Sequence, residues 1–412
     1  MSRFFFRITP KTMDTNHYIN LETKYGANNY APLDVVISSG QGIWVEDVDG
    51  KRYMDCLSAY SAVNQGHCHP QIVETLMHQI QSIHLTSRAF RNDQLGPFYE
   101  SICKLTGYEK VLPMNTGAEA IETAIKTARK WGYTRKGVPT GQAEIIVCEG
   151  NFHGRTVSII SFSSSTQYRE GFSPYTPGFT IVPYGDCEAL REAVKPNTVA
   201  FLFEPIQGEG GIIVPPDGYL NEAREICSQE NILMIADEIQ TGLGRTGKLF
   251  ACDHEGVKPD MMVLGKALSG GAYPVSVVLS SSEILDVFNP GDHGSTYGGN
   301  PLGCAVAQTA LDVLVKGKMI ENSARMGQYF REKLRKISSP HVKEVRGKGL
   351  LVGLELKPEA GGGRRFCEAL KSRGILAKTA HTHVIRFAPP LIVTKADLDW
   401  ALSIIEDVLM MD

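Results

Sequence analysis

ILMIADEIQTG (residues 232–242) and MMVLGKAL (residues 261–268) are the two stretches that decide the fold. Each begins with a short apolar run that ends at a reactive side chain, Asp237 in the first and Lys266 in the second. Strands that lack polar alternation are buried on both faces, as in parallel sheets. Because ligands of an open parallel sheet bind at the carboxyl ends of its strands, we expect both side chains in one crevice.

Short apolar runs of the same kind recur through the middle of the chain. They alternate with helical periodicities, such as the one between Ala120 and Trp131. Strands that alternate with helices indicate an α/β architecture with a largely parallel sheet. The other apolar runs are residues 145–148, 199–203 and 275–279.

The two ends of the chain have a different pattern, which predicts a second, smaller lobe. Residues 42–53 have the pattern of a hairpin, and strands are expected near 349–355 and 384–388, before a final helix from about Lys395. We predict an α+β lobe built from both termini. The expected division is 1–69 for its N-terminal segment, 70–319 for the large lobe and 320–412 for its C-terminal part.

The composition excludes several classes of protein. The 412 residues are 42% apolar and 21% charged, with a formal net charge of −3. Basic residues are interspersed with acids, so no nucleic-acid face is expected, and no apolar run is long enough to cross a membrane. Nine cysteines without a Cys-x-x-Cys pair indicate reduced thiols. The expected partners are small molecules and copies of the same chain.

The first residues, from Met1 to Met13, carry three phenylalanines among basic residues and no acid before Asp14. This segment could be the stub of an organelle leader, but its apolar stretch is too brief for a secretory signal. We expect a disordered tail and a cytoplasmic protein that is not secreted, with the mitochondrial matrix as the alternative.

The position expected for Lys266 would make it a nucleophile. Burial penalises an ammonium and lowers its pKa, which favours the neutral amine that attacks an aldehyde. The alternative is a lysine that reaches solvent and an Asp237 that caps a helix, and either residue taken singly favours that alternative. Their combination with an anion site argues for a Schiff-base lysine.

Residues 115–120 offer such an anion site. Thr116 and Glu119 have the spacing of a capping box. Gly117 and Ala118 place backbone N–H groups, without bulky side chains, at the positive end of a helix dipole. A well-capped helix without a ligand is the simpler alternative, and both can be true. Residues 294–301 offer hydroxyl groups at a second helix start.

Two further motifs are weaker. Residues 242–248, GLGRTGK, resemble a nucleotide P-loop, but Leu249 stands where a magnesium-binding hydroxyl is required. His67 and His69 could suggest a metal, yet no third ligand has a suitable spacing, and Pro70 marks a helix start. We expect neither nucleotide binding nor a metal site, and interpret the histidine segment as a turn.

Three of these segments resemble the signature of class III, fold-type I, pyridoxal-phosphate-dependent aminotransferases: 236–242, 264–268 and 294–301. The resemblance extends from about Tyr25 to the C-terminus. It is closest to the ornithine aminotransferase family, on the long matching runs 25–30, 61–70, 114–120 and 385–390.

The resemblance implies the following roles toward the cofactor. Lys266 would hold pyridoxal phosphate as a Schiff base and move a proton between substrate and cofactor. Asp237 would pair with the pyridine nitrogen, Gln240 would bond the phenolic oxygen, and Phe152 would stack on the ring.

The phosphate would be bound by Gly117 and Ala118, with Ser295 and Thr296 reaching it from a second subunit. The resemblance therefore implies a homodimer with shared sites.

The implied reaction moves the δ-amino group of L-ornithine to 2-oxoglutarate, giving glutamate 5-semialdehyde, which cyclises to pyrroline-5-carboxylate, and glutamate. Arg155 and Tyr30 would bind the distant carboxylate of ornithine, and Arg386 the near carboxylate of glutamate. Glu209 would neutralise Arg386 while ornithine is bound, and Tyr60 would pack against the aliphatic stem. The alternative for the three charged residues is surface ion pairing.

Two positions depart from the family pattern. His153 stands where a bulkier aromatic residue is common, and Gly210 is expected to widen the loop beside Glu209. The rival enzymes are N-acetylornithine and 4-aminobutyrate aminotransferases. The rival from another class is a non-catalytic, self-associating binding protein on the same fold, against which intact Lys266, Asp237 and Gln240 argue.

Overall fold

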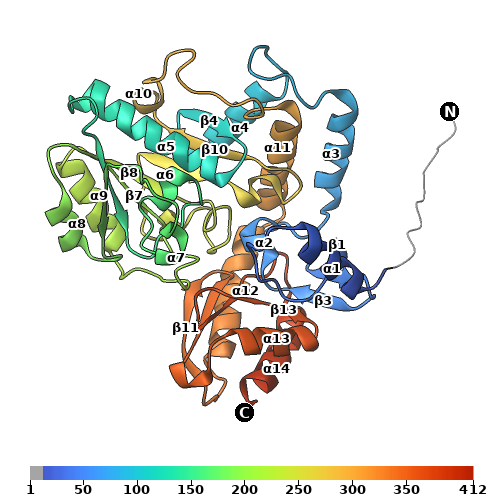
Figure 1. The fold of residues 1–412 in the computed structure, drawn as a ribbon. Helices are drawn as coiled ribbons and strands as arrows, with labels where there is room; N and C mark the ends of the chain where they lie inside the picture. Colours follow the sequence, from blue (N-terminus) through green and yellow to red (C-terminus); the bar gives the residue numbers. More distant parts are fainter. Residues whose placement is uncertain (1–12, 412) are drawn as a thin grey trace, which may run out of the picture.

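A seven-stranded sheet forms the centre of the larger lobe in the computed structural model, which describes residues 13–411 (Figure 1). The tail predicted over residues 1–13 lies, apart from Met13, outside the described residues. The strand order is β4-β10-β9-β8-β7-β5-β6. The strands are β4 (Lys110–Met114), β5 (Glu144–Cys148), β6 (Phe179–Val182), β7 (Thr198–Phe203), β8 (Leu233–Asp237), β9 (Met261–Leu264) and β10 (Ser276–Ser280).

The predicted parallel sheet is confirmed, with one strand reversed. Strands β9, β8, β7, β5 and β6 are parallel to one another, whereas β10 is antiparallel to both β9 and β4. A parallel connection needs a crossover of a dozen or more residues. Between β9 and β10 the chain forms only a short 3-10 turn, η3 (Lys266–Ser269), and then returns.

Helices cover both faces of this sheet, because alternate strand residues enter two different cores. Ile145 and Val147 of β5 pack in the core that contains α5, whereas Ile146 and Cys148 pack in the core of α8 and α9. Figure 1 shows α8 and α9 at the left of the lobe. The helices of residues 70–316 are α3 (Pro70–Ser82), α4 (Leu95–Thr106), α5 (Gly117–Trp131), η1 (Gly132–Lys136), α6 (Val157–Ile160), α7 (Thr166–Arg169), α8 (Cys187–Ala193), α9 (Tyr219–Gln229), η2 (Ala251–His254), α10 (Ser282–Leu285) and α11 (Pro301–Lys316).

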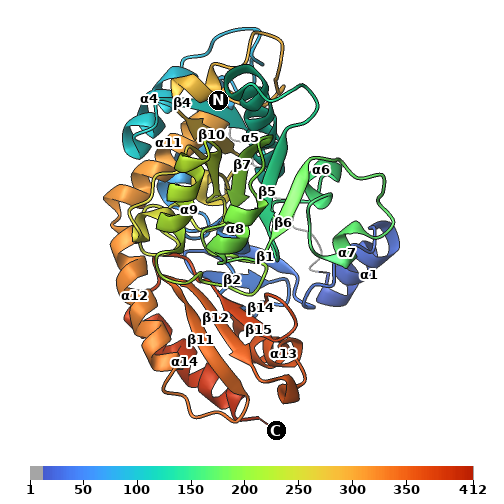
Figure 2. The same cartoon turned by 90° about the vertical axis from the view of Figure 1, so that its left-hand side faces the viewer.

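Both ends of the chain contribute to the lower part of the molecule. Strand β13, near the C-terminus, pairs in parallel with β3, so that Ile375 lies opposite Met54. Figure 2 shows a four-stranded sheet, β11-β12-β15-β14, and residues of α12 and α13 pack in one hydrophobic core with β12. The division at residues 69 and 319 stays a prediction. These elements are α1 (Thr15–Tyr25), β1 (Ile37–Gln41), β2 (Trp44–Asp47), β3 (Arg52–Asp55), α2 (Ser58–Ser61), α12 (Met319–Leu334), β11 (Val342–Lys348), β12 (Leu351–Leu356), η4 (Pro358–Ala360), α13 (Arg364–Ser372), β13 (Ile375–Leu376), β14 (Lys378–Thr379), β15 (Val384–Phe387) and α14 (Lys395–Leu409).

The loop that resembles a P-loop carries a buried structural cation. The Arg245 guanidinium donates through Nη1 to the backbone oxygens of Leu350 (3.0 Å) and Pro389 (2.7 Å), and through Nη2 to Asn64 Oδ1 (2.5 Å). Burial lowers the pKa of Arg245 to about 9. One side chain thus joins three segments that are far apart in the sequence.

The other weak motif also has structural contacts. His67 Nε2 lies 2.7 Å from Asp55 Oδ2, and the segment leads into α3 at Pro70. Among residues 13–411, no group of three or more His, Cys, Asp or Glu side chains is arranged to hold a metal ion. In the same part of the chain, no helix has both the length and the apolar character needed to span a membrane.

Candidate functional site

Asp237 and Lys266 meet at one edge of the large sheet, as the sequence predicts. Asp237 is the last residue of β8, and Lys266 follows β9 after a single glycine. The parallel register places Asp237 opposite Val263, three residues before Lys266. Both side chains line a cavity of about 150 Å³, called the inner cavity here, together with Gly117, Ala118, Phe152, Glu209 and Gln240.

The Lys266 side chain is partly buried and electrostatically perturbed. Burial lowers the pKa of Lys266, against the attraction of Glu209 and Asp237. Its backbone φ of 44° lies in the left-handed region, a strain that is common at functional sites. Within residues 13–411, Nζ makes no hydrogen bond. The amine is therefore available as a nucleophile.

Asp237 is held by a buried histidine. Its Oδ2 lies 2.7 Å from His153 Nδ1, and its Oδ1 accepts a hydrogen bond from the backbone N–H of Ile239 at 3.0 Å. Burial alone would lower the pKa of His153, but the hydrogen bond and the charge of Asp237 raise it. His153 thus orients the carboxylate of the inner cavity.

Glu204 is a site residue that the sequence analysis missed. It is buried, lines the inner cavity, and accepts hydrogen bonds from the backbone N–H groups of Phe152 (2.9 Å) and Gly208 (3.2 Å). Burial raises the pKa of Glu204 to about 7, although His153 opposes the shift. Glu204 directly follows the apolar run of β7, so the strand-end argument used for Asp237 would have found it.

The predicted capping box is present at the start of α5. Glu119 N–H donates to Thr116 Oγ1 at 3.2 Å, and Thr116 N–H donates to Glu119 Oε2 at 2.8 Å. Gly117 and Ala118 are the first two helical residues, whose N–H groups have no acceptor within the helix. They face the inner cavity and form an anion site at the positive helix end.

The polar groups of the inner cavity, among them an unpaired amide, indicate whether it suits pyridoxal phosphate. Gln240 Oε1 is buried and has no hydrogen-bond partner within the described chain. A Cβ on Gly208 would lie only 1.7 Å from this oxygen, so a larger residue there would force the Gln240 amide to move. A free amine, a carboxylate and an anion site line the same cavity, and this set fits an aldehyde, a pyridine nitrogen and a phosphate.

A larger cavity of about 870 Å³, called the outer cavity here, is lined by the predicted substrate residues Tyr30, Tyr60 and Arg155. Phe152 and Glu209 line both cavities and therefore mark their junction. The Arg155 guanidinium lies 4.0 Å from the ring centre of Tyr168 and 5.7 Å from that of Phe152. These ring contacts orient a cation at the outer cavity.

Arg386 forms the predicted ion pair with Glu209. Arg386 Nη1 lies 2.5 Å from Glu209 Oε1, and the arginine side chain is only 1% exposed. Burial alone would raise the pKa of Glu209, but Arg386 lowers it. Arg386 Nε and Nη2 are buried without a hydrogen-bond partner in the described part of the chain. This cation retains capacity for a second anion.

The expectation that Gly210 widens the loop beside Glu209 stays a prediction. A Cβ at this position would lie 3.1 Å from both the backbone oxygen of Gly150 and Gln207 Oε1. The neighbours of Gly210 are therefore closely packed and would have to shift slightly to accept a larger residue. Glu209 itself is restrained by Arg386 and by a 3.4 Å hydrogen bond from Gln240 Nε2.

Ser295 and Thr296 do not line either cavity in the single chain. Ser295 Oγ accepts hydrogen bonds from Asn115 Nδ2 and from the backbone N–H of Gly298, each at 3.0 Å. Thr296 is exposed. Their expected contact with a phosphate stays a prediction.

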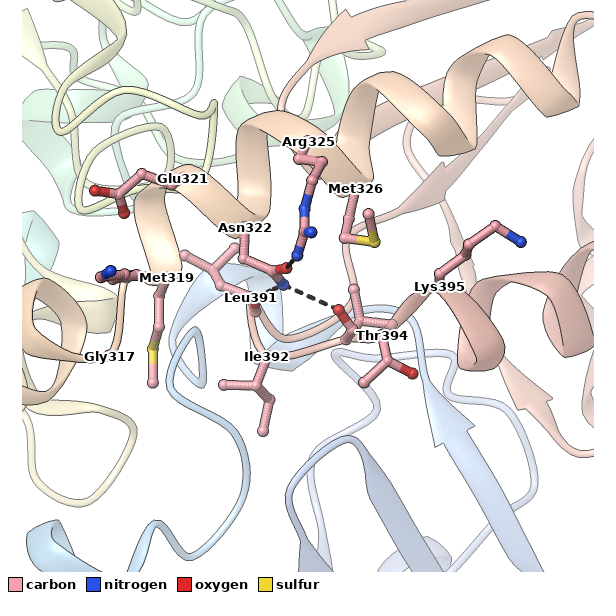
Figure 3. Close-up of a pocket in the computed structure, with 12 residues that line it drawn as sticks. Gly317, Met319, Glu321, Asn322, Arg325, Met326, Leu391, Ile392, Thr394 and Lys395 are labelled. Atoms are coloured by element: carbon pink, nitrogen blue, oxygen red, sulfur yellow. Dashed lines mark hydrogen bonds between the residues drawn. The ribbon is translucent and has the colours of Figure 1, made fainter.

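A separate hollow of about 770 Å³ lies between the start of α12 and residues 391–395 (Figure 3). Asn322 Nδ2 donates to the backbone oxygens of Leu391 (2.7 Å) and Val393 (2.9 Å), and Arg325 donates to Asn322 Oδ1. None of the predicted site residues lines this hollow. Its polar side chains fasten α12 to the loop before α14.

Comparison with known proteins identifies the class. The Aminotransferase class-III family matches residues 25–409, and the chain belongs to this family. Its fold is the α/β fold of the pyridoxal-phosphate-dependent enzymes, fold type I. Pyridoxal phosphate is accordingly its cofactor.

The particular branch follows from individual relatives. The chain is 60% identical to the ornithine aminotransferase of Geobacillus sp. (strain WCH70) over 394 residues, covering 96% of this chain and 98% of that protein. It is similar to the Toxoplasma gondii ornithine aminotransferase structure, with a TM-score of 0.96, 45% identity, and coverage of 97% and 95%. Acetylornithine aminotransferase from Elizabethkingia anophelis gives a TM-score of 0.88 at 48% identity, with coverage of 96% and 99%.

Replacing Glu204 with Gln should change the pH dependence of stability. A carboxyl group whose pKa rises from 4.5 to about 7 on folding contributes stability below pH 4.5 that is lost as the pH rises through 7. Glu204→Gln removes this pH-dependent loss of folding free energy, which is at most about 3 kcal/mol. We expect urea unfolding at fixed protein concentration to show that the variant gains more unfolding free energy over the wild-type protein at pH 8 than at pH 5. A difference that does not vary with pH would contradict the assignment.

Proposed function

We propose that this chain is an ornithine aminotransferase that moves the δ-amino group of L-ornithine to 2-oxoglutarate. The observation that carries the proposal is the Glu209–Arg386 ion pair, whose glutamate lines the inner cavity, with a second cation, Arg155, on the outer cavity. Such a site offers two carboxylate positions, one of which is neutralised reversibly. The products are glutamate 5-semialdehyde, which cyclises to pyrroline-5-carboxylate, and glutamate.

When bound, pyridoxal phosphate supplies an aromatic ring that accepts the negative charge left after a substrate carbon loses its proton. Lys266 Nζ would hold the cofactor and would take and return that proton, for which a lowered pKa suits it. Asp237, oriented by His153, would keep a proton on the pyridine nitrogen. Gln240 would bind the phenolic oxygen, and Phe152 would pack on the ring face.

The start of α5 would hold the phosphate group. Gly117 and Ala118 would donate their backbone N–H groups, and the positive end of the helix dipole favours an anion there.

Substrate selection follows from charge. Ornithine places its δ-amine toward Lys266 and its α-carboxylate toward Arg155 and Tyr30, while Tyr60 packs on the aliphatic stem. Glu209 then neutralises Arg386, because an unpaired buried cation is costly. When glutamate or 2-oxoglutarate binds, its near carboxylate replaces Glu209 on Arg386.

The assembly that we propose is a homodimer with shared sites, in which Ser295 and Thr296 reach the phosphate of the partner. An exposed apolar patch supports this assembly, because monomeric proteins rarely expose contiguous apolar surface. The patch comprises Val73, Met77 and Ile80, spaced along one face of α3.

Two measurements together test the reaction: the identity of its product and the residue to which the cofactor is attached. We expect the purified protein to form pyrroline-5-carboxylate from ornithine and 2-oxoglutarate, with much lower rates on acetylornithine and 4-aminobutyrate. Borohydride reduction followed by peptide mass spectrometry should place the cofactor on Lys266, and Lys266→Ala should abolish both signals. Turnover of acetylornithine alone would favour that rival enzyme, and a colourless, unmodified protein would favour the non-catalytic binding protein.

Glu209→Ala should impair the choice of amino group. Without Glu209, Arg386 is free to bind the α-carboxylate of ornithine and to bring its α-amine to Lys266. We expect the ratio of α- to δ-transfer to rise at least ~10-fold, which corresponds to about 1.4 kcal/mol. Product analysis by chromatography measures this ratio, with Glu149→Ala as a control on the outer cavity. Unchanged regiospecificity would contradict the role of Glu209.

Met77→Asp should weaken the dimer, because it places a charge in the centre of the apolar patch. We expect a shift toward monomer in sedimentation velocity, accompanied by weaker cofactor retention if the phosphate site is shared. Met410→Asp is the matched control, since Met410 is similarly exposed, at 55% against 53%, and lies at the end of α14. A Met77→Asp protein that stays dimeric would exclude this patch as the interface.

A further inference from the structure

Two cations face each other across one strand pair beside the substrate cavity. Lys378 of β14 lies directly opposite Arg386 of β15 in the antiparallel register. Directly opposed side chains lie on the same face of a sheet, and like charges in these positions are destabilising. Arg386 is compensated by Glu209. Lys378 makes no ion pair within residues 13–411, so the strand pair has one uncompensated positive charge.

Tyr60 fixes the position of this charge. Lys378 Nζ donates to Tyr60 Oη at 2.9 Å and lies 5.7 Å from the ring centre, while the Arg386 guanidinium lies 4.8 Å from the same centre. Both cations therefore contact one aromatic ring. A phenolic hydroxyl orients an ammonium but does not neutralise it.

The turn that carries Tyr60 is rigidly supported. Residues 58–61 have four successive left-handed φ angles, of 51°, 47°, 60° and 73°, without any glycine. Such strain persists only where surrounding contacts enforce it. Asp55 Oδ1 accepts hydrogen bonds from the N–H groups of Leu57 and Ser58, and Ser58 Oγ donates to the backbone oxygen of Ala388. Tyr60 and its bound lysine are thus preorganised.

The other charged residues of the outer cavity leave Lys378 available for an anion. Glu209 is engaged by Arg386, and Arg364 is engaged by Glu368 and by the backbone oxygens of residues 31 and 32. Glu149 also lines this cavity but forms no ion pair in the described chain. Lys378 is therefore a positioned ammonium on the wall of a substrate cavity.

We propose that Lys378 is a specificity-determining residue that binds, together with Arg386, the carboxylate that glutamate and 2-oxoglutarate carry and ornithine lacks. This inference rests on the proposed function. The dicarboxylic substrate gains an ammonium contact at the Arg386 side of the cavity. Ornithine places its single carboxylate at Arg155 and therefore makes no contact with the Lys378 ammonium. The two halves of the reaction thus depend on Lys378 to different degrees.

Equilibrium binding to the purified holoenzyme tests this directly. Glutarate has two carboxylates, and 5-aminovalerate has the same chain length with one carboxylate and an amine. We expect Lys378→Met to weaken glutarate binding at least ~10-fold by calorimetry, as loss of a charged hydrogen bond implies. Binding of 5-aminovalerate should change less than ~3-fold, and Lys378→Arg should restore most of the glutarate affinity.

Single-turnover kinetics give a second readout through the cofactor absorbance. Lys378→Met should raise the concentration of 2-oxoglutarate needed for half-maximal rate, while that of ornithine stays near the wild-type value. Lys316→Met is the matched control, because Lys316 is exposed on α11 and paired with Asp312. Lys378→Gln is the second variant if Lys378→Met fails to fold.

Two outcomes would overturn the proposal. If Lys378→Met weakens the binding of glutarate and of 5-aminovalerate equally, and Tyr60→Phe has the same effect, Lys378 only positions Tyr60. If the binding of both ligands is unchanged, Lys378 neither binds the carboxylate nor positions Tyr60. The glutarate measurement needs no turnover of ornithine. A protein that binds glutarate through Lys378 but does not transaminate ornithine would therefore refute the proposed function and leave only the dicarboxylate-binding role of Lys378 standing.

Discussion

The parallel alignment of β8 with β9 is the constraint on which the rest of the site depends. Parallel neighbours end at the same sheet edge, so their registered pairing brings Asp237 and Lys266 into one small cavity. An ammonium there loses hydration, and its pKa falls. The energetic cost of placing a lysine in this position is also the origin of its reactivity.

Two pairs of oppositely charged groups lie around that amine. His153 compensates Asp237, and Glu209 compensates Arg386. Buried ions that lack partners are expensive, so each pair restrains the conformation of both members. Within residues 13–411, two nitrogen atoms of Arg386 have no hydrogen-bond partner, and Lys378 has only a neutral partner, Tyr60.

Arg245 connects this arrangement to the fold. Its hydrogen bonds reach Asn64, four residues from Tyr60, and Pro389, three residues from Arg386. The buried guanidinium thus joins the turn with Tyr60 to the strand with Arg386. The sequence motif around it resembles a nucleotide loop, but the physical role of its arginine is to bind backbone oxygens of distant segments.

The sequence by itself determined the elements whose signals are local. Unbroken apolar runs predicted β5, β7, β8 and β9, and the Thr116–Glu119 spacing predicted the start of α5, because strand burial and helix capping depend on near neighbours. Strand ends also located Asp237 and Lys266. Tertiary structure alone decided the reversed direction of β10, the left-handed turn at Tyr60, the crowding at Gly210, and the pairing of His153 with Asp237. These features depend on contacts between segments tens to hundreds of residues apart, whose direction and packing no local pattern encodes.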